Sequence, residues 1–277
     1  MTTSAPFDLD AYLARIGLPR PAAADVAALG RLHAAHLARI PFENLDVRLK
    51  RPVGLDLESL QAGLVRRRRG GYCFQQNTLF AAALAALGFE VDTLEARVRP
   101  PGAPGPLPRT HMVLRVTVEG APWLADVGFG GEGPLYPVPL GGAPMDEPAG
   151  TYRIEEEPGR IDEEPGVHVL RLGAGGTWRD LYAFTLAPAL PVDYEVSHHY
   201  TSTHPRSPFV NTLTVQRTTP ERRQMLRGRL YVEQAGERET RRELTDEEVV
   251  RLVIEEIGLD VPAEDVVRAL PVEMRVA

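Results

Sequence analysis

The stretch that decides the fold surrounds the chain's only cysteine: Arg69-Gly70-Gly71-Tyr72-Cys73-Phe74-Gln75-Gln76-Asn77. Its two adjacent glycines allow a closer backbone approach than larger residues would permit. The apolar residues Phe80, Leu84 and Leu87 then recur at the spacing of one helix face. A glycine follows them, so we expect Cys73 to lie in the first turn of a helix that ends near residue 88.

A cysteine in that position is either a nucleophile or an inert core residue. Free cysteines are more often buried packing. At a helix N-terminus, however, the unpaired N–H groups and the helix dipole stabilise an anion, and four arginines, Arg66 to Arg69, lie just upstream. We interpret Cys73 as a candidate nucleophile, provided that the rest of the chain supplies a base.

Composition limits the possible functions and partners. The chain has 277 residues, of which 43% are apolar, and a formal net charge of −7, which argues against nucleic acid as a partner. The first residues lack the apolar core of a signal peptide and no apolar run reaches membrane length, so we expect a cytoplasmic protein with no membrane partner. One cysteine and 7 histidines without an HExxH pattern predict no metal site. The oligomeric state stays open.

Hydrophobic periodicity predicts an α+β fold in three domains, residues 1–88, 89–190 and 191–277. The first has the period of helices, expected at 8–17, 23–39, 57–67 and after Cys73. The second alternates like an antiparallel barrel or sandwich, with strands expected at 89–98, 111–118, 123–126, 167–172 and 178–184 and loops at 137–150 and 155–164. In the third we expect an irregular segment at 194–209, strands at 210–217, 229–233 and 237–243, and two closing helices.

Two polar residues at strand ends can serve a cysteine nucleophile. His111 opens one predicted strand and Asp126 closes the next, with a Glu119-Gly120 turn between them. Antiparallel pairing across that turn brings the two ends nearly level. A cysteine nucleophile needs a base and a third group that holds the base in one tautomer. The sequence therefore predicts a triad of Cys73, His111 and Asp126.

The stretch around Cys73 resembles the active-site signature of the arylamine N-acetyltransferases, R-G-G-x-C-x-[EQ]-x-N. The likeness continues in family order between about Tyr12 and Arg227. Four further blocks carry it: P-F-E-N-L at Pro41 to Leu45, the histidine strand at Thr110 to Met112, D-V-G-F-G at Asp126 to Gly130, and S-T-H-P-x-S-x-F at Ser202 to Phe209.

This resemblance implies a papain-like fold with an N-terminal helical bundle, a central antiparallel β-barrel and a C-terminal α/β lid. It implies that acetyl-CoA acetylates Cys73 and that the acetyl group passes to an arylamine or arylhydrazine, without a metal. The family pattern further implies an aryl pocket lined by Phe42, Phe129 and Phe209. Thr110 and Gly128 match positions against the acyl site.

The same resemblance implies a buried structural ion cluster of Arg15, Glu43 and Arg68. Two alternatives to the acetyltransferase remain. An amide synthase or hydrolase would use the same triad with a tethered amine or water as acceptor. A non-catalytic thiol sensor would use Cys73 alone, but it would have no need of a base held by a carboxylate.

Overall fold

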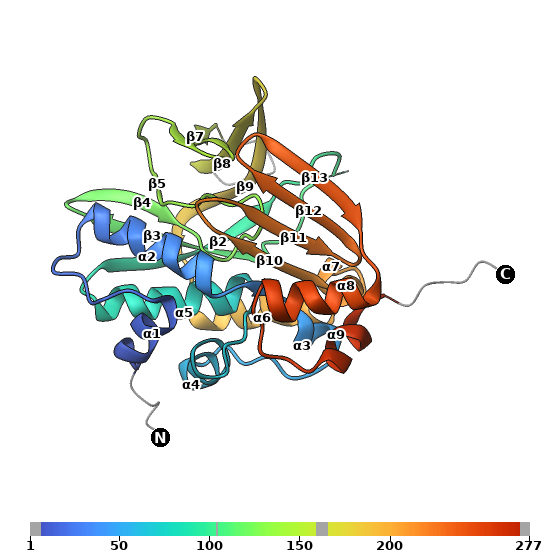
Figure 1. Ribbon diagram of the computed structural model, residues 1–277. Helices are drawn as coiled ribbons and strands as arrows, with labels where there is room; N and C mark the ends of the chain where they lie inside the picture. Colours follow the sequence, from blue (N-terminus) through green and yellow to red (C-terminus); the bar gives the residue numbers. More distant parts are fainter. Residues whose placement is uncertain (1–6, 104, 159–165, 272–277) are drawn as a thin grey trace.

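The computed structural model describes residues 7–103, 105–158 and 166–271 and has an α+β architecture, as predicted. Helices from the first part of the chain lie beneath an eight-stranded antiparallel sheet, and a second, five-stranded sheet stands beside it with the C-terminal helices (Figure 1). Of the helices in these ranges, none is long and apolar enough to cross a bilayer.

The N-terminal helices begin and end close to the predicted residues, except for the short α3 (Leu45–Arg48), which was not predicted. The others are α1 (Leu9–Ile16), α2 (Val26–Arg39), α4 (Leu57–Leu60), which continues as a π-helix over Gln61–Arg66, and α5 (Cys73–Ala86). Asp8 caps α1 by accepting a hydrogen bond from the Ala11 N–H, and Gly17 ends it with φ of 76°. Local signals therefore specify these helices.

The larger sheet forms a nearly closed barrel in the order β5-β4-β3-β2-β9-β8-β7-β6. Its strands are β2 (Glu90–Val98), β3 (His111–Val118), β4 (Ala121–Ala125), β5 (Val138–Pro139), β6 (Met145–Glu147), β7 (Gly150–Glu157), β8 (Val167–Ala174) and β9 (Thr177–Pro188). Val118 pairs with Ala121 across the predicted turn, where Glu119 has φ of 52°. The β3–β4 hairpin thus has the expected register.

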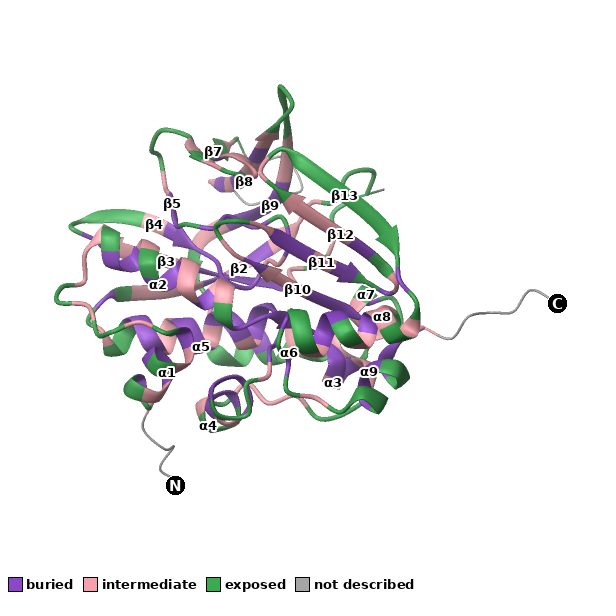
Figure 2. Ribbon diagram, in the orientation of Figure 1, coloured by how far each residue is buried: buried purple, intermediate pink, exposed green. Residues whose placement is uncertain are grey.

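The smaller sheet has the order β1-β10-β11-β12-β13. Its strands are β1 (Phe42–Glu43), β10 (Thr214–Thr218), β11 (Arg223–Arg227), β12 (Leu230–Ala235) and β13 (Arg238–Glu243). The helices around it are α6 (Pro191–Thr203), α7 (Pro208–Asn211), α8 (Asp246–Arg251), which runs on as a π-helix over Leu252–Glu256, and α9 (Ala263–Ala269). Figure 2 shows β13 as an exposed edge.

Three main apolar cores hold these layers together. In the first, α1, α2 and α5 pack against the alternate residues of β3 from Met112 to Val118. In the second, the barrel interior is filled by side chains such as Val113 and Tyr182. The third lies between the smaller sheet and α8 and α9. The division into three domains stays a prediction, and β1 of the first section pairs with β10 of the last.

The structure corrects the prediction of an irregular segment at 194–209, because most of it belongs to α6. Pro191 occupies the first helical turn, and Asp193 accepts a hydrogen bond from the Leu190 N–H. Tyr194 and His198 dock the helix onto Phe74 and Tyr72 of the nucleophile stretch. Its serines, threonines and histidines are weak helix formers, so distant packing rather than local propensity stabilises this helix.

Other strand and loop predictions also differ from the structure. The predicted strand at 210–217 begins only at Thr214, and β11 was not predicted. The acidic segment from Glu155 is not simply a loop, because β7 extends through Glu157; residues 159–164 of that prediction lie outside the described part. Arg171 of β8 pairs with Glu155 and Glu157, so cross-strand charges permit acidic residues in a strand. Short strands β5 and β6 interrupt the predicted loop at 137–150.

Candidate active site

Cys73 is the first residue of α5, as the sequence predicted. It is 3% exposed, and its Sγ lies 3.6 Å from the carbonyl oxygen of Thr110, to which the thiol donates. The preceding residue, Tyr72, is extended and caps the helix from a β conformation. The thiol therefore lies at the positive end of the helix dipole.

His111 and Asp126 form a buried pair beside this helix end. The distance from His111 Nε2 to Asp126 Oδ2 is 2.7 Å, and the two side chains are 3% and 0% exposed. Burial lowers the pKa of His111, but the charge and hydrogen bond of Asp126 outweigh it and raise the pKa to about 10. Because Nε2 is engaged by Asp126, Nδ1 is the nitrogen left to exchange a proton with the sulfur.

The carboxylate of Asp126 is held from several sides. Its Oδ1 accepts hydrogen bonds from Asn77 Nδ2 and from the Gly128 N–H, both at 2.9 Å. Its backbone N–H donates to His33 Nε2 at 3.0 Å, and His33 Nδ1 lies 2.9 Å from the Leu135 carbonyl. Burial by itself raises the pKa of Asp126. The charge of His111 and the hydrogen bonds from His111, Asn77 and Gly128 have the larger effect, so the pKa lies below its usual range. Asp126 is thus a fixed anion.

Gly128 lies directly against the nucleophile, at the acyl site that the resemblance implies. A Cβ at this position would lie 2.7 Å from the Cys73 Cα and 2.7 Å from Asn77 Nδ2. No side chain fits in that space without displacing the backbone of α5. Thr110, whose carbonyl accepts from Sγ, is half-buried.

The three phenylalanines named for the aryl pocket lie in two groups. Phe129 is half-buried, with its ring centroid 5.3 Å from that of His111. Phe42 and Phe209 lie together, with centroids 5.8 Å apart. Phe209 also stacks on Tyr72 at 5.7 Å. A Cβ at Gly130, next to Phe129, would lie 3.7 Å from the Phe42 ring, so the Phe42 ring lies close to the backbone that follows Phe129.

The structure corrects the predicted ion cluster of Arg15, Glu43 and Arg68. Glu43 pairs instead with Arg69, at 2.7 Å from Nη2 to Oε1, and Asp46 completes the cluster at 3.4 Å. Arg68 is exposed. Arg15 donates to the Leu64 carbonyl, and burial followed by the like charges of Arg68 and Arg39 lowers its pKa to about 10. The sequence alone does not show which of the two adjacent arginines reaches Glu43. That depends on the path of the backbone, which turns at Arg68 with φ of 53°.

Three residues of the site were not predicted. Asn77 closes the nucleophile stretch, and its position in that stretch was the available signal. His33 is a buried histidine of α2, and no local pattern links it to Asp126. Tyr182 of β9 packs between His111 and Phe129, with centroids 5.0 Å from each, and the strand pattern identifies it only as a core residue.

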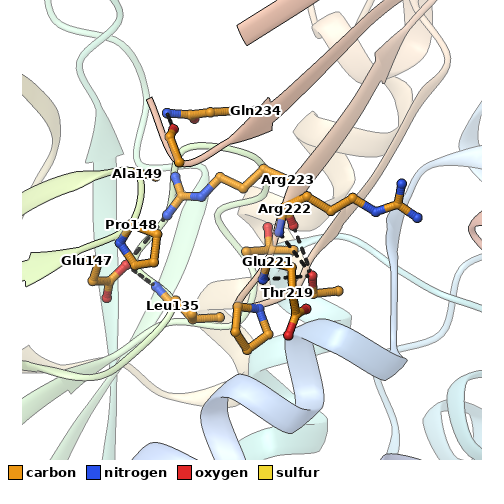
Figure 3. Close-up of a pocket in the computed structure, with 12 residues that line it drawn as sticks. Leu135, Glu147, Pro148, Ala149, Thr219, Glu221, Arg222, Arg223 and Gln234 are labelled. Carbon is orange, nitrogen blue, oxygen red and sulfur yellow. Dashed lines mark hydrogen bonds and ion pairs between the residues drawn. The ribbon is translucent and has the colours of Figure 1, made fainter. Parts of the chain in front are cut away.

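No metal site is found in residues 7–103, 105–158 and 166–271, because no group of three or more His, Cys, Asp or Glu side chains is arranged to hold an ion. A pocket lies between the barrel and the smaller sheet, where Glu147 and Arg223 line it (Figure 3). None of Cys73, His111 and Asp126 lines it. The side chains that the structure gathers beside the Cys73 thiol are the imidazole of His111 and the carboxylate of Asp126.

Known proteins share both the sequence and this structure. A family model described as N-acetyltransferase matches residues 25–266. The arylamine N-acetyltransferase of Mycolicibacterium smegmatis is 43% identical over 263 residues, which is 91% of this chain and 92% of that protein.

Solved structures agree with these matches. An M. smegmatis arylamine N-acetyltransferase structure has a TM-score of 0.87 and 37% identity, covering 95% of this chain and 98% of the other. The Mycobacterium marinum arylamine N-acetyltransferase in complex with CoA has a TM-score of 0.86 and 34% identity, again covering 95% and 98%. The overall arrangement of helical bundle, β-barrel and α/β lid is thereby confirmed. The chain belongs to the arylamine N-acetyltransferase family.

Proposed function

We propose that this acetyltransferase moves an acetyl group from acetyl-CoA to an arylamine or arylhydrazine nitrogen through a thioester on Cys73. The observation that carries the proposal is the placement of Cys73 at the start of α5, beside His111 held at 2.7 Å by Asp126. Its family membership and the CoA bound to the M. marinum relative support acetyl-CoA as the donor.

In the first half-reaction His111 holds the proton of the Cys73 thiol as an imidazolium, in keeping with its raised pKa. The thiolate attacks the carbonyl carbon of the acetyl thioester, and the new C–S bond forms as the bond to the CoA sulfur breaks. CoA leaves as a thiol with the proton that His111 held. The negative oxygen of the tetrahedral intermediate would be met by backbone N–H groups, and that of Cys73 is the first candidate.

In the second half-reaction the acceptor nitrogen attacks the acetyl carbon. A C–N bond forms, the C–S bond to Cys73 breaks, and a proton passes from the nitrogen to His111 and on to the sulfur. An aryl nitrogen is unprotonated at pH 7 and can attack directly, whereas an alkyl ammonium must first lose a proton. Asp126 stabilises the imidazolium in both steps.

The acceptor would lie against the aromatic residues that flank the triad. Phe129 packs on His111, and the pair of Phe42 and Phe209 lies close to Gly130, the next residue along the chain. A flat ring between such walls gains about 0.5–1.5 kcal/mol for each ring pair beyond the apolar area that it buries. This favours arylamines and arylhydrazines over alkylamines of equal size.

Intact-mass measurement after incubation with acetyl-CoA alone tests the mechanism. We expect one acetyl group on Cys73, discharge by an arylhydrazine, and neither event in Cys73→Ala. Peptide mapping of the label to a lysine would sink the thioester route. Rapid loss of the label to water in the absence of acceptor would identify a hydrolase instead.

A further inference from the structure

The segment that follows Asp126, residues 128–136, is here named the glycine loop. It carries Phe129 onto His111 and then returns to the barrel, with a turn closed by the hydrogen bond from the Gly133 N–H to the Gly130 carbonyl at 2.8 Å. Glycines at 128, 130, 131 and 133 give the loop little side-chain packing of its own. Side chains that reach it from elsewhere therefore help to fix its position.

Two side chains of the smaller sheet hold the middle of the glycine loop. Gln216 of β10 accepts a hydrogen bond from the Gly131 N–H at 2.5 Å through Oε1. Arg223 of β11 donates from Nη1 to the Gly131 carbonyl at 3.1 Å. Both backbone groups of one glycine are thus satisfied by the C-terminal part of the chain, more than 80 residues along the sequence.

The approach between loop and sheet is close. A Cβ at Gly131 would overlap with the side chain of Met225, and one at Gly130 would overlap with Gln216. Gly130 also has φ of 86°. The loop backbone therefore lies directly on β10 and β11, so movement of either strand would be passed to the residue next to Phe129.

A buried ion pair anchors this contact. Arg223 and Glu147 are 5% and 1% exposed and lie 3.5 Å apart. Glu147 in turn accepts hydrogen bonds from the backbone N–H groups of Leu135 and Tyr136, at 2.8 and 2.9 Å, which end the glycine loop. Figure 3 shows Arg223 pointing toward Glu147 and Arg222 pointing away from it. Arg223 thus joins the middle and the end of the loop.

The triad is held mainly by other contacts. Asn77 and His33 reach Asp126 from the helices, and the Gly128 N–H bonds it from the start of the glycine loop, away from Gly131. Phe129 lies between Gly128 and the Gly130–Gly131 segment held by the smaller sheet, so the loop backbone contributes to its position. Displacing Gly131 would move this segment while Asn77 and His33 still hold Asp126.

We propose that Gln216 and Arg223 are positioning residues for the acetyl acceptor, which set the place of Phe129 by holding Gly131. This role rests on the proposed function, in which the acetyl acceptor lies against Phe129 during the second half-reaction. The smaller sheet then controls acceptor recognition through the loop backbone.

The test compares the two half-reactions in matched variants. Gln216→Leu removes the acceptor oxygen, whereas Gln216→Glu keeps it. Arg222→Met is the control for Arg223→Met, because Arg222 is the neighbouring arginine and pairs with Glu233 instead, at 3.2 Å. Since Arg223→Met leaves Glu147 buried without its partner, the double variant Arg223→Met with Glu147→Gln is measured as well.

We expect Gln216→Leu and the double variant to raise the KM for an arylhydrazine about three- to tenfold, the effect of losing one hydrogen bond to the loop. Acetylation of Cys73 by acetyl-CoA and the melting temperature of Gln216→Leu should stay near wild type. The KM of Gln216→Glu for the arylhydrazine should return toward the wild-type value. Arg222→Met should leave both half-reactions unchanged.

Two outcomes would overturn the inference. Unchanged KM in Gln216→Leu and in the double variant would show that the loop is held without them. An equal loss in both half-reactions, not recovered in Gln216→Glu, would assign the contacts to general stability. Wild-type protein is measured first, because a failure to form the thioester at all would overturn the proposed function and this inference together. If the wild-type thioester forms normally, either of the two outcomes overturns only the roles given to Gln216 and Arg223.

Discussion

The backbone N–H of Asp126 donates a hydrogen bond to Nε2 of His33, across 3.0 Å and 93 positions of the chain. The other ring nitrogen of His33 donates to the Leu135 carbonyl, so the imidazole is neutral with its proton on Nδ1. Burial lowers the pKa of His33 to about 4, which keeps this tautomer in place at neutral pH. One side chain of α2 thereby fixes both ends of the segment between Asp126 and Leu135.

Replacing His33 should affect both stability and acylation. His33→Phe leaves the Asp126 N–H and the Leu135 carbonyl without partners, and we expect a loss of about 1–3 kcal/mol in the free energy of unfolding. The rate of Cys73 acetylation should fall as Asp126 loses its anchor. Urea unfolding and single-turnover acetylation measure the two effects. His168→Phe, on the barrel strand β8, is the control and should leave acetylation unchanged.

Acid should destabilise the protein through its buried neutral histidines. Burial lowers the pKa of His33 to about 4 and that of His36 to about 3, against 6.5 in the unfolded chain. Between these values the unfolded state binds more protons, so the free energy of unfolding falls as the pH falls below 6.5. Each histidine contributes about 1.4 kcal/mol per pH unit. Urea titrations at pH 7, 6 and 5 measure the slope, and a flat profile would show that these histidines titrate normally.

The Asp126→Asn variant tests the pairing with His111. An amide at this position cannot stabilise the imidazolium, so the pKa of His111 should drop from about 10 toward its usual range. We expect acetylation of Cys73 to slow by roughly 10³- to 10⁴-fold, as in comparable triads. Single-turnover rates on the folded variant provide the measurement. A folded variant with near-normal rate would show that Asp126 does not act through His111.

The two adjacent arginines before the glycine pair should differ in their effect on stability. Arg69→Met leaves Glu43, which is 3% exposed, without its cation, and we expect a loss of about 3 kcal/mol. Arg68→Met removes an exposed charge that repels Arg15 and should change stability by less than about 0.5 kcal/mol. Chemical denaturation of both variants measures the two losses in the free energy of unfolding. Equal losses would restore Arg68 to the ion cluster.

Phe129→Ala tests the aromatic wall itself. We expect a higher KM for arylamines, because the acceptor ring loses a stacking partner worth about 0.5–1.5 kcal/mol. Acetylation of Cys73 should be largely retained, since that half-reaction needs no ring against Phe129. Phe129→Leu keeps an apolar side chain against His111, so its KM for arylamines should lie between those of wild type and Phe129→Ala. If acetylation falls as far as transfer does, Phe129 belongs to the acyl site or to the packing of His111.

Local signals were enough to predict the elements that bring the triad together. The glycine pair and helical spacing predicted Cys73 at the start of α5, and one tight turn predicted the register of β3 with β4. Where contacts between residues far apart in the sequence determine the secondary structure, the prediction was wrong or missing. α6 is a helix because Tyr194 and His198 dock on the nucleophile stretch, and β7 tolerates Glu155 because Arg171 lies opposite.

The residues that orient the triad were harder to predict than the triad itself. His33 and Tyr182 meet His111 and Asp126 only after the chain has folded, from positions that resemble ordinary core residues in the sequence. The choice between Arg68 and Arg69 depends on one backbone turn with positive φ, which a non-glycine residue does not reveal. Such features need the three-dimensional structure.

The pairing of β1 with β10 has a consequence for synthesis on the ribosome. Phe42 is registered with Gln216, so the edge of the smaller sheet that carries Phe42 cannot form until the chain has been extended by more than 170 residues. Domains usually fold as units while the N-terminal part emerges first, but here an early strand must wait for a late one. A nascent chain that ends before Thr214 already contains Cys73, His111 and Asp126, yet it leaves the side of β1 that pairs with β10 without its partner strand. Such a chain would expose a strand edge beside a reactive thiol, so translational pausing in this interval carries a risk of aggregation that the finished protein does not.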